Sequence, residues 1–301
     1  MRYLLVANPR SGRNRGEAAA REAAAALVAL GAEAEIRFTS GPDTAGALAA
    51  ELAPDFDRVL AVGGDGTLNE VLAGVVAPHP ARPLGVIPVG TANVIARELG
   101  LPLGRPARAA RALHRGAPVP VAWGLANGRP FVANVGAGFD AIAVHRLTEA
   151  RRARPGSSPG MLGYLPIGWR IFRHWRSPRL RATVDDRELE GTFSSAIICN
   201  ARNYGGVLEL TPDADLGSMS FRLAARRGEG RLTILRHLAW GFLGWKDSAR
   251  RVTLAEGRRL EIRSDGDEGA EVQVDGDPRG RTPLVVELAS EPLQLLAPRR
   301  R

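Results

Sequence analysis

The sequence predicts two domains, an N-terminal doubly wound α/β domain and a C-terminal antiparallel β-sandwich domain. Three observations lead to this prediction. The chain has 301 residues, which is more than one hydrophobic core usually serves. Its first ~125 residues alternate strand-like and helix-like patterns, as in a parallel sheet with helices on both faces. From about Pro120 onward, short strand patterns separated by turn residues dominate instead.

The first half contains apolar runs that alternate with alanine-rich or amphipathic stretches. The run at 3–7 ends at Asn8-Pro9, as a buried strand should, and the alanine-rich stretch at 16–30 is stopped by Gly31. In order, we expect strands at 3–7, 35–39, 58–62 and 84–89, and helices at 16–30, 44–52, 67–76, 92–99 and 105–114. We place this domain at residues 1–124.

The second half consists mostly of short alternating or apolar runs. Asn127-Gly128 and Asp185-Asp186 each separate two such runs, as hairpin turns do. We expect strands at 119–125, 130–135, 180–184, 188–193, 194–199, 219–224, 252–254, 259–263, 271–274, 284–288 and 293–296, and helices at 161–175 and 231–245. We place this domain at residues 125–289.

Composition excludes several classes of function. The chain carries 41 basic and 32 acidic side chains, and Lys246 is its only lysine. Asp247 follows it, so the chain has no Walker A loop, and no expected strand carries the lysine that a protein kinase needs. Cys199 is the only cysteine, which excludes an intrachain disulfide and a cysteine-based zinc site and indicates a reducing compartment. No signal peptide and no run of ~18 apolar residues is present, so we expect a cytoplasmic protein whose membrane contacts are peripheral.

The strongest motif is the glycine-rich stretch Gly63–Glu70, which follows a strand and opens a helix. Ligands bind at this end of open α/β sheets, and the first N–H groups of the helix, those of Gly66, Thr67 and Leu68, would face an anion. A carboxylate placed beside a phosphate is repelled by it. The presence of Asp65 in this motif therefore suggests either that it helps to bind a metal ion or that it removes a proton from a reacting group. The alternative is a tight turn in which Asp65 caps the helix.

Three more loops follow strands of the first domain at the same edge of the sheet. They are 8–13, which is rich in phosphate-type donors, 39–41, and 90–93, which starts a helix. None has the GxGxxG form of a dinucleotide fold. Any one of them alone is more often a simple turn, but four small, polar or glycine-rich loops together predict a cleft for nucleotide phosphates.

The combination of these loops resembles the diacylglycerol kinase catalytic-domain family, which includes bacterial soluble lipid kinases and is related to sphingosine and ceramide kinases. The similarity runs essentially end to end. It is carried by the segments 8–12, 63–71, 88–93, 136–140, 200–206, 212–214 and 275–277. The motif GGDGT also occurs in NAD kinases, but Asn69-Glu70-Val71 after it favours the lipid kinases.

The resemblance implies an ATP- and Mg²⁺-dependent lipid kinase whose active site lies between the domains, with about residues 290–301 returning to the first domain. Asp277, at the position of the family's glutamate, would accept the proton of the lipid hydroxyl. Asp65 and Asp275 would line the same cleft and help to place Mg²⁺ and the attacking oxygen. The residues expected to bind ATP are Asn8, Arg13, Thr39, Gly64, Asp65, Gly66, Thr67, Leu68, Asn69, Glu70 and Thr91. Read without the resemblance, Asp275 and Asp277 would simply flank a hairpin turn, since Asp-Gly is a common hairpin pair.

Two departures from the family pattern bear on activity. Where the family has Asp-Asp-Gly, this chain has Leu216 before Gly217, with Asp213 and Asp215 nearby as the remaining candidates for a metal site. Asp277 is one methylene shorter than glutamate, which shifts a base by about an ångström and matters for rate. A catalytically degenerate, lipid-binding protein is therefore one alternative, and an NAD kinase-like phosphotransferase is another.

The segment 146–182 contains nine arginines and one acid, with tryptophans interleaved. Arginine beside tryptophan on an amphipathic helix suits an anionic membrane surface, where a lipid kinase must find its substrate. The alternative is a helix that packs its tryptophans on the β domain and exposes its arginines. Nucleic acid also attracts basic aromatic segments, but the chain has no recognised nucleic-acid module, and we expect no nucleic-acid partner.

Overall fold

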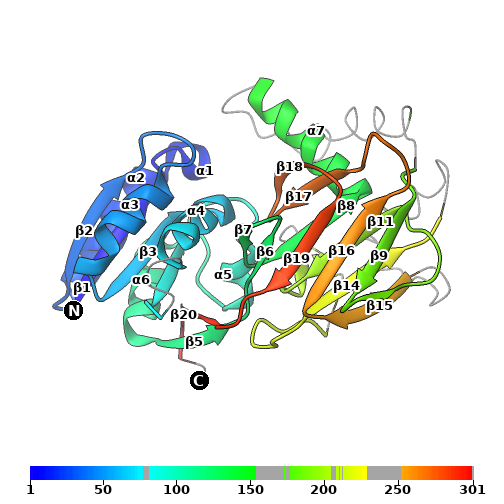
Figure 1. The fold of residues 1–301 in the computed structure, drawn as a ribbon. Coiled ribbons are helices and arrows are strands. Elements are labelled where there is room, and N and C mark those ends of the chain that lie inside the picture. Colours follow the sequence, from blue (N-terminus) through cyan, green and yellow to red (C-terminus); the bar gives the residue numbers. More distant parts are fainter. Residues whose placement is uncertain are drawn as a thin grey trace.

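The computed structural model describes residues 1–76, 81–153, 173, 177–204, 208–209, 211, 213–228 and 252–299. Figure 1 shows an N-terminal α/β domain beside a domain of two β-sheets. The predicted fold class, α/β followed by a β-sandwich, is confirmed. Within the described residues, no helix combines the length and the apolar character needed to cross a membrane.

The first domain is built on one six-stranded sheet. Its strands are, in spatial order, β2 (Glu33–Phe38), β1 (Arg2–Ala7), β3 (Arg58–Gly63), β4 (Leu84–Pro88), β20 (Leu293–Ala297) and β5 (Ala117–Val121). All neighbours run parallel except β5, which is antiparallel to β20, so the sheet is mixed rather than wholly parallel as expected. Pro118 and Pro120 lack the N–H group that a central strand needs, which suits β5 to the edge of the sheet.

The helices of this domain are α1 (Ser11–Asn14), α2 (Gly16–Val28), α3 (Ala45–Leu52), α4 (Asp65–Val76), α5 (Val94–Glu98) and α6 (Pro106–Arg115), with a 3₁₀ turn at Ala53–Asp55. α2 packs against α6 and α3 packs against α4. In α2 the buried side chains Ala20, Ala23 and Leu27 recur at helical spacing and cover the apolar strands. Helix packing therefore leaves the loops at the carboxyl ends of β1, β3 and β4 to form a site.

The second domain packs two antiparallel sheets over one apolar core, which includes Phe131, Leu180 and Phe221. One sheet contains β10 (Arg187–Glu188), β9 (Leu180–Val184), β16 (Arg259–Ser264), β19 (Leu284–Leu288), β6 (Gly124–Ala126) and β7 (Arg129–Phe131). The other contains β15 (Val252–Gly257), β14 (Phe221–Arg226), β11 (Ser195–Cys199), β8 (Asn134–Gly138), β17 (Glu271–Val274) and β18 (Asp277–Arg281). A small ladder joins β12 (Asn203–Tyr204) to β13 (Leu208–Glu209).

Several elements differ from the sequence prediction. The strand expected at 119–125 is two strands, because β5 belongs to the first sheet and β6 to the second. Helix α7 (Phe139–Ala153) was not predicted, although no glycine or proline interrupts it. β18 was not predicted because Pro278 and Gly280 are poor strand formers. The helices expected at 161–175 and 231–245 lie outside the described residues, apart from Arg173.

The chain leaves the sheet of the first domain after β5, enters the second domain at β6, and returns to the first sheet between β19 and β20. Through β20, residues 293–297 lie in the first sheet. We propose that the first domain consists of residues 1–124 together with about 290–301, and that the second domain consists of residues 125–289.

Candidate active site

Three loops of the first domain meet at the carboxyl ends of β1, β3 and β4, and glycines allow them to touch. A Cβ atom at Gly12 would lie 2.3 Å from the Val89 carbonyl oxygen, and one at Gly90 would lie 2.6 Å from the Cα atom of Gly64. Gly12 also has φ +58°, a conformation that side chains disfavour. The cradle formed by these loops therefore depends on glycine at each of these positions.

Replacement of Gly90 by alanine tests this contact. We expect Gly90→Ala to lower the free energy of unfolding by about 1–3 kcal/mol, because the added methyl group must push two backbone segments apart. Gly41→Ala is the matched control, since a Cβ atom there meets nothing within 4 Å. Urea denaturation of both variants measures the difference, and equal stabilities of the two would contradict the close packing.

Helix α4 begins in this cradle, but not all of its predicted N–H donors are available. The Leu68 N–H group donates to the Gly64 carbonyl oxygen at 3.1 Å, so it is already used within the turn. Leu68 is 1% exposed, and the Thr67 side chain fills the space beside Gly63. The N–H groups of Gly66 and Thr67 belong to the first turn, where the helix itself supplies no acceptor, and remain the candidates for an anion.

Asp65 fastens two of the loops together. Its carboxylate accepts hydrogen bonds from the backbone N–H groups of Asn93, Val94 and Ile95 at the start of α5, and from its own N–H group. Burial raises the pKa of this carboxyl, and these hydrogen bonds oppose the rise. Asp65 thus joins the start of α4 to the start of α5, a contact that the capping alternative did not include.

The other expected nucleotide residues lie around the same edge. Asn8 Oδ1 accepts the Arg10 N–H group at 3.0 Å and shapes the first loop, in which Arg13 has φ +61°. Thr39 is buried at the end of β2, and Thr91 is exposed on the third loop. The Oε2 atom of Glu70 accepts the Ala45 N–H group at 3.1 Å, which caps α3.

The second domain delivers Asp275 and Asp277 to this cradle on the hairpin of β17 and β18. Asp275 and Gly276 have φ +48° and +84°, as the central residues of a tight Asp-Gly hairpin turn do. Asp277 Oδ2 lies 3.9 Å from the position that a Cβ atom would take at Gly66. Residues 66 and 277, far apart in the sequence, therefore face each other across the domain interface.

The Asp275 carboxylate is fully occupied by hydrogen bonds. Asn69 Nδ2 in α4 donates to Oδ2 at 2.8 Å, and the backbone N–H groups of Val132, Ala133 and Asn134 donate at 2.9, 2.9 and 2.6 Å. Burial raises the pKa of Asp275 to about 6 against the effect of these donors. Asp275 therefore ties the hairpin both to its own domain and to α4 of the first domain.

Asp277 differs in being half exposed, with a side-chain accessibility of 50%. The Arg279 guanidinium lies 3.4 Å from its Oδ2 atom. Of the two hairpin carboxylates, Asp277 is the one that a substrate can reach.

The predicted metal residues do not form a metal centre by themselves. Asp213 and Asp215 are exposed, and Asp215 Oδ1 accepts the Gly217 N–H group at 3.0 Å. Leu216 turns inward and packs in the core of the first domain. Among the residues that the structure describes, no three His, Cys, Asp or Glu side chains come together in a way that could hold a metal ion. The metal role of Asp213 and Asp215 stays a prediction without geometric support.

A second tie between the domains was not predicted from the sequence. Glu98 of α5 accepts the Asn203 N–H group at 2.7 Å and lies 3.7 Å from Arg202. Asn134 Nδ2 donates to the Asn203 carbonyl oxygen at 3.0 Å. Glu98 is the last residue of α5, the helix that follows the loop 90–93. Its place at the end of that helix is the one feature of the sequence that could have suggested its interdomain contact.

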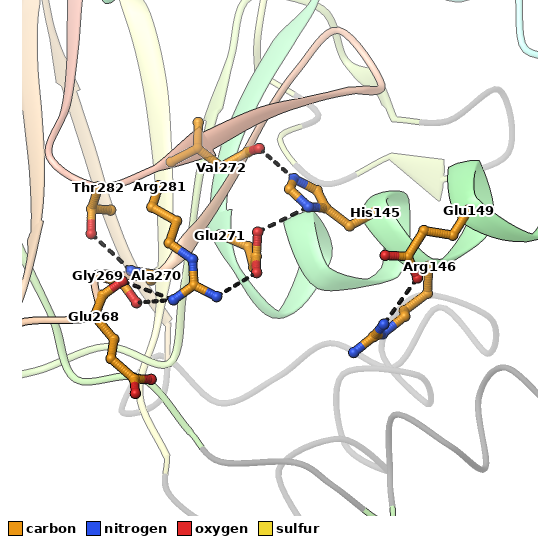
Figure 2. A network of polar contacts seen from close by, with 10 residues as sticks. All are labelled: His145, Arg146, Glu149, Glu268, Gly269, Ala270, Glu271, Val272, Arg281 and Thr282. Atoms are coloured by element: carbon orange, nitrogen blue, oxygen red, sulfur yellow. Dashed lines mark hydrogen bonds and ion pairs between the residues drawn. The ribbon is translucent and has the colours of Figure 1, made fainter.

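Helix α7 rests on the hairpin strand β17 through two polar side chains. His145 lies between the Glu271 carboxylate and the Val272 carbonyl oxygen, each at 2.9 Å, and Arg281 of β18 binds the other oxygen of Glu271 at 2.8 Å (Figure 2). Five residues earlier in α7, buried Asp140 accepts hydrogen bonds from Gln273 and Tyr204, both at 3.2 Å. Helix α7 thus braces the hairpin through polar contacts with β17.

Burial raises the pKa of Asp140 to about 6, which gives a testable pH dependence. Between about pH 6 and pH 4 the folded protein binds a proton at Asp140 while the unfolded chain does not, so the folded state gains stability as the pH falls. Relative to the non-titrating variant Asp140→Asn, the wild type should gain about 3 kcal/mol over this interval. Urea denaturation of both proteins at several pH values measures the gap. A gap that does not change with pH would contradict the assignment.

Comparisons with known proteins agree with this architecture. The family described as "Diacylglycerol kinase catalytic domain" matches residues 2–126, and "YegS C-terminal NAD kinase beta sandwich-like domain" matches residues 133–297. A diacylglycerol kinase of Bacillus subtilis is 29% identical over 94% of this chain and 91% of its own length. A probable YegS-like lipid kinase of Pseudomonas aeruginosa is 32% identical over 71% of this chain and 68% of its own length. The crystal structure of a diacylglycerol kinase from Bacillus anthracis superposes with a TM-score of 0.74 over 99% of this chain and 97% of that chain, at 21% identity.

Proposed function

This chain belongs to the bacterial diacylglycerol kinase family of lipid kinases, and from that premise we propose that it transfers the γ-phosphoryl group of ATP to a hydroxyl group of a diacylglycerol-like or sphingoid lipid. The observation that carries this proposal is the approach of Asp277 to Gly66 across the domain interface. It brings a reachable carboxylate from the second domain to the glycine cradle of the first.

The cradle suits the phosphates of ATP. Because Gly64 and Gly90 carry no side chains, the backbones of their two loops lie in close contact and no side chain fills the space there. The first turn of α4 offers N–H groups to an anion. We assign to nucleotide binding the segment 64–69 and the four residues of the neighbouring loops, Asn8, Arg13, Thr39 and Thr91. Glu70 remains in the expected nucleotide-binding set, and its Oε2 atom also accepts the Ala45 N–H group at the start of α3.

Asp277 is assigned as the base that receives the proton of the lipid hydroxyl. The oxygen of that hydroxyl attacks the γ-phosphorus, the bond from this phosphorus to the β–γ bridging oxygen breaks, and ADP leaves with the electron pair. Phosphoryl transfer of this kind depends chiefly on positioning and charge neutralisation. Asp65 and Asp275 supply positioning, because both carboxylates are used by hydrogen bonds that fix the loops.

Magnesium is the expected counter-ion of the ATP phosphates, and in such sites one or two carboxylates plus phosphate oxygens commonly hold it. Because Asp213 and Asp215 form no cluster with other ligands within the described residues, no step of the reaction is routed through them.

We further propose that the protein meets its lipid at an anionic membrane surface. The chain has a net charge of +9, and α6 exposes Arg108, Arg111 and Arg115. Cationic side chains near a surface of acidic lipids each contribute about 1 kcal/mol to binding. Co-sedimentation with vesicles of phosphatidylglycerol, compared with vesicles of phosphatidylcholine at two salt concentrations, tests this proposal, and equal binding to both would contradict it.

The test of the enzymatic proposal is transfer of label from γ-labelled ATP, with Mg²⁺, to a bacterial lipid extract in mixed micelles. A labelled lipid supports the proposal, and its mass identifies the acceptor. Parallel reactions contain NAD in place of lipid, or no acceptor. Label on NAD alone would favour an NAD kinase-like enzyme, and vesicle binding without any transfer would favour a degenerate lipid-binding protein.

A further inference from the structure

The hairpin that carries Asp277 also carries two arginines in β18, Arg279 and Arg281. The register with β17 shifts within this strand: Asp277 pairs with Val274, whereas Arg281 pairs with Glu271, three positions away in β17. Simple alternation therefore does not place Asp277 and Arg281 on one face. Arg281 is held in place: its guanidinium binds the Glu271 carboxylate and the Glu268 carbonyl oxygen, each at 2.8 Å (Figure 2). Arg281 therefore serves the hairpin and its contact with α7.

Arg279 is placed differently. In the part of the chain that the structure describes, its polar contact is the 3.4 Å approach to Asp277 Oδ2. Charge-assisted pairs between guanidinium and carboxylate groups usually lie at about 2.7–2.9 Å. The Arg279 side chain is 33% exposed, so it is partly desolvated and only loosely paired.

The same Asp277 oxygen lies 3.9 Å from the Cβ position of Gly66. The guanidinium group consequently stands next to the glycine cradle, where the terminal phosphate of the nucleotide is expected. An arginine cannot lose its charge at neutral pH, so it will exchange a loose carboxylate partner for a stronger anion that enters the site. A phosphate is such an anion, and it matches the guanidinium geometry.

We propose that Arg279 is a further catalytic residue, which leaves Asp277 when ATP binds and contacts the γ-phosphate. Its movement serves two purposes. It neutralises charge on the phosphoryl group in transfer, and it frees the Asp277 carboxylate to accept the proton of the lipid hydroxyl. The only lysine of the chain, Lys246, lies outside these motifs, so arginine must supply the positive charge that neutralises the phosphates. This inference rests on the proposed kinase function.

The experiment compares the wild type with Arg279→Ala and Arg279→Lys. Removal of one preorganised cationic donor should lower kcat by about 10²–10³-fold in Arg279→Ala, whereas Arg279→Lys should keep part of the rate. Arg187→Ala is the matched control, because Arg187 is an exposed arginine of β10 on the other sheet. Circular dichroism and thermal melting show that each variant is folded.

A binding measurement separates direct contact from a structural role. If Arg279 contacts the γ-phosphate, Arg279→Ala should lose roughly tenfold in affinity for ATP while its affinity for ADP stays unchanged. Calorimetric titration with ATP, ADP and a non-hydrolysable ATP analogue measures this preference. Equal affinities of the wild type and Arg279→Ala for ATP, or an equal loss for ATP and ADP, would overturn the inference.

The two proposals fail in different ways. If the wild type transfers no label to any lipid, the proposed function is wrong, and the ATP-over-ADP preference still decides the role of Arg279. If the wild type transfers label and Arg279→Ala does so within twofold of the same kcat, the inference is wrong and the proposed function stands.

Discussion

Replacement of Asp277 by asparagine is expected to lower kcat by about 10²–10⁴-fold, the range that a positioned general base contributes. Asparagine has nearly the same shape but cannot accept the proton of the lipid hydroxyl. The KM for ATP should change little, because the cradle of loops that holds the nucleotide belongs to the first domain. Initial rates of label transfer at saturating lipid and varied ATP measure both quantities.

Two further variants sharpen this prediction. Asp277→Glu restores the family's residue and should retain activity well above that of Asp277→Asn, since it keeps a carboxylate and adds only one methylene. Asp267→Asn is the matched control, because Asp267 is an exposed aspartate in the segment just before β17. If Asp277→Asn turned over as fast as Asp267→Asn, the base would have to be another group.

Much of the fold can be predicted from the sequence because its signals are local. The buried strand β3 and the helix after it appear in the sequence as an apolar run, a glycine cluster and an amphipathic stretch. The strand β18 could not be predicted in this way, since Pro278 and Gly280 oppose strand formation and only its pairing with β17 fixes it. The split of the strand expected at 119–125 likewise depends on two different sheets meeting at Ala122 and Trp123.

The members of the candidate site could be named from motifs, but not their contacts. Asp275 was expected to help to place the attacking oxygen, whereas its carboxylate is used by Asn69, 206 positions away, and by Val132, 143 positions away. Glu70 is expected to contact ATP from its motif alone, and its hydrogen bond with the Ala45 N–H group of α3 could not be read from that motif. Such partners are set by packing of distant segments, which no local pattern of residue types encodes.

Loss of the Asp275 carboxylate is expected to have the largest effect on stability. Asp275→Ala leaves three backbone N–H groups and the Asn69 amide without their acceptor, and each buried donor without a partner costs about 1–3 kcal/mol. We therefore expect a loss of about 3 kcal/mol or more in the free energy of unfolding. Urea denaturation measures it, and Asp267→Asn serves again as the control.

The contact with Asn69 allows the effect on positioning to be separated from the effect on stability. Asn69→Ala removes the one donor in this set that comes from the first domain and leaves the three backbone donors of the second domain satisfied. It should therefore cost only about 1 kcal/mol of stability, the usual net value of one hydrogen bond. It should nevertheless lower kcat by about tenfold or more, because the hairpin that carries Asp277 loses its tie to the α4 helix of the glycine cradle.

A double-mutant cycle completes the argument. If Asn69 and Asp275 act through their mutual hydrogen bond, Asn69→Ala should have no further effect on kcat in the Asp275→Ala background, where both acceptor oxygens are gone. Asp275→Ala is preferred to Asp275→Asn here, because asparagine would keep one oxygen that can still accept the Asn69 donor. Additive losses of kcat in the double variant would show that the two residues act independently, and the interdomain tie would then have no part in placing Asp277 against the nucleotide.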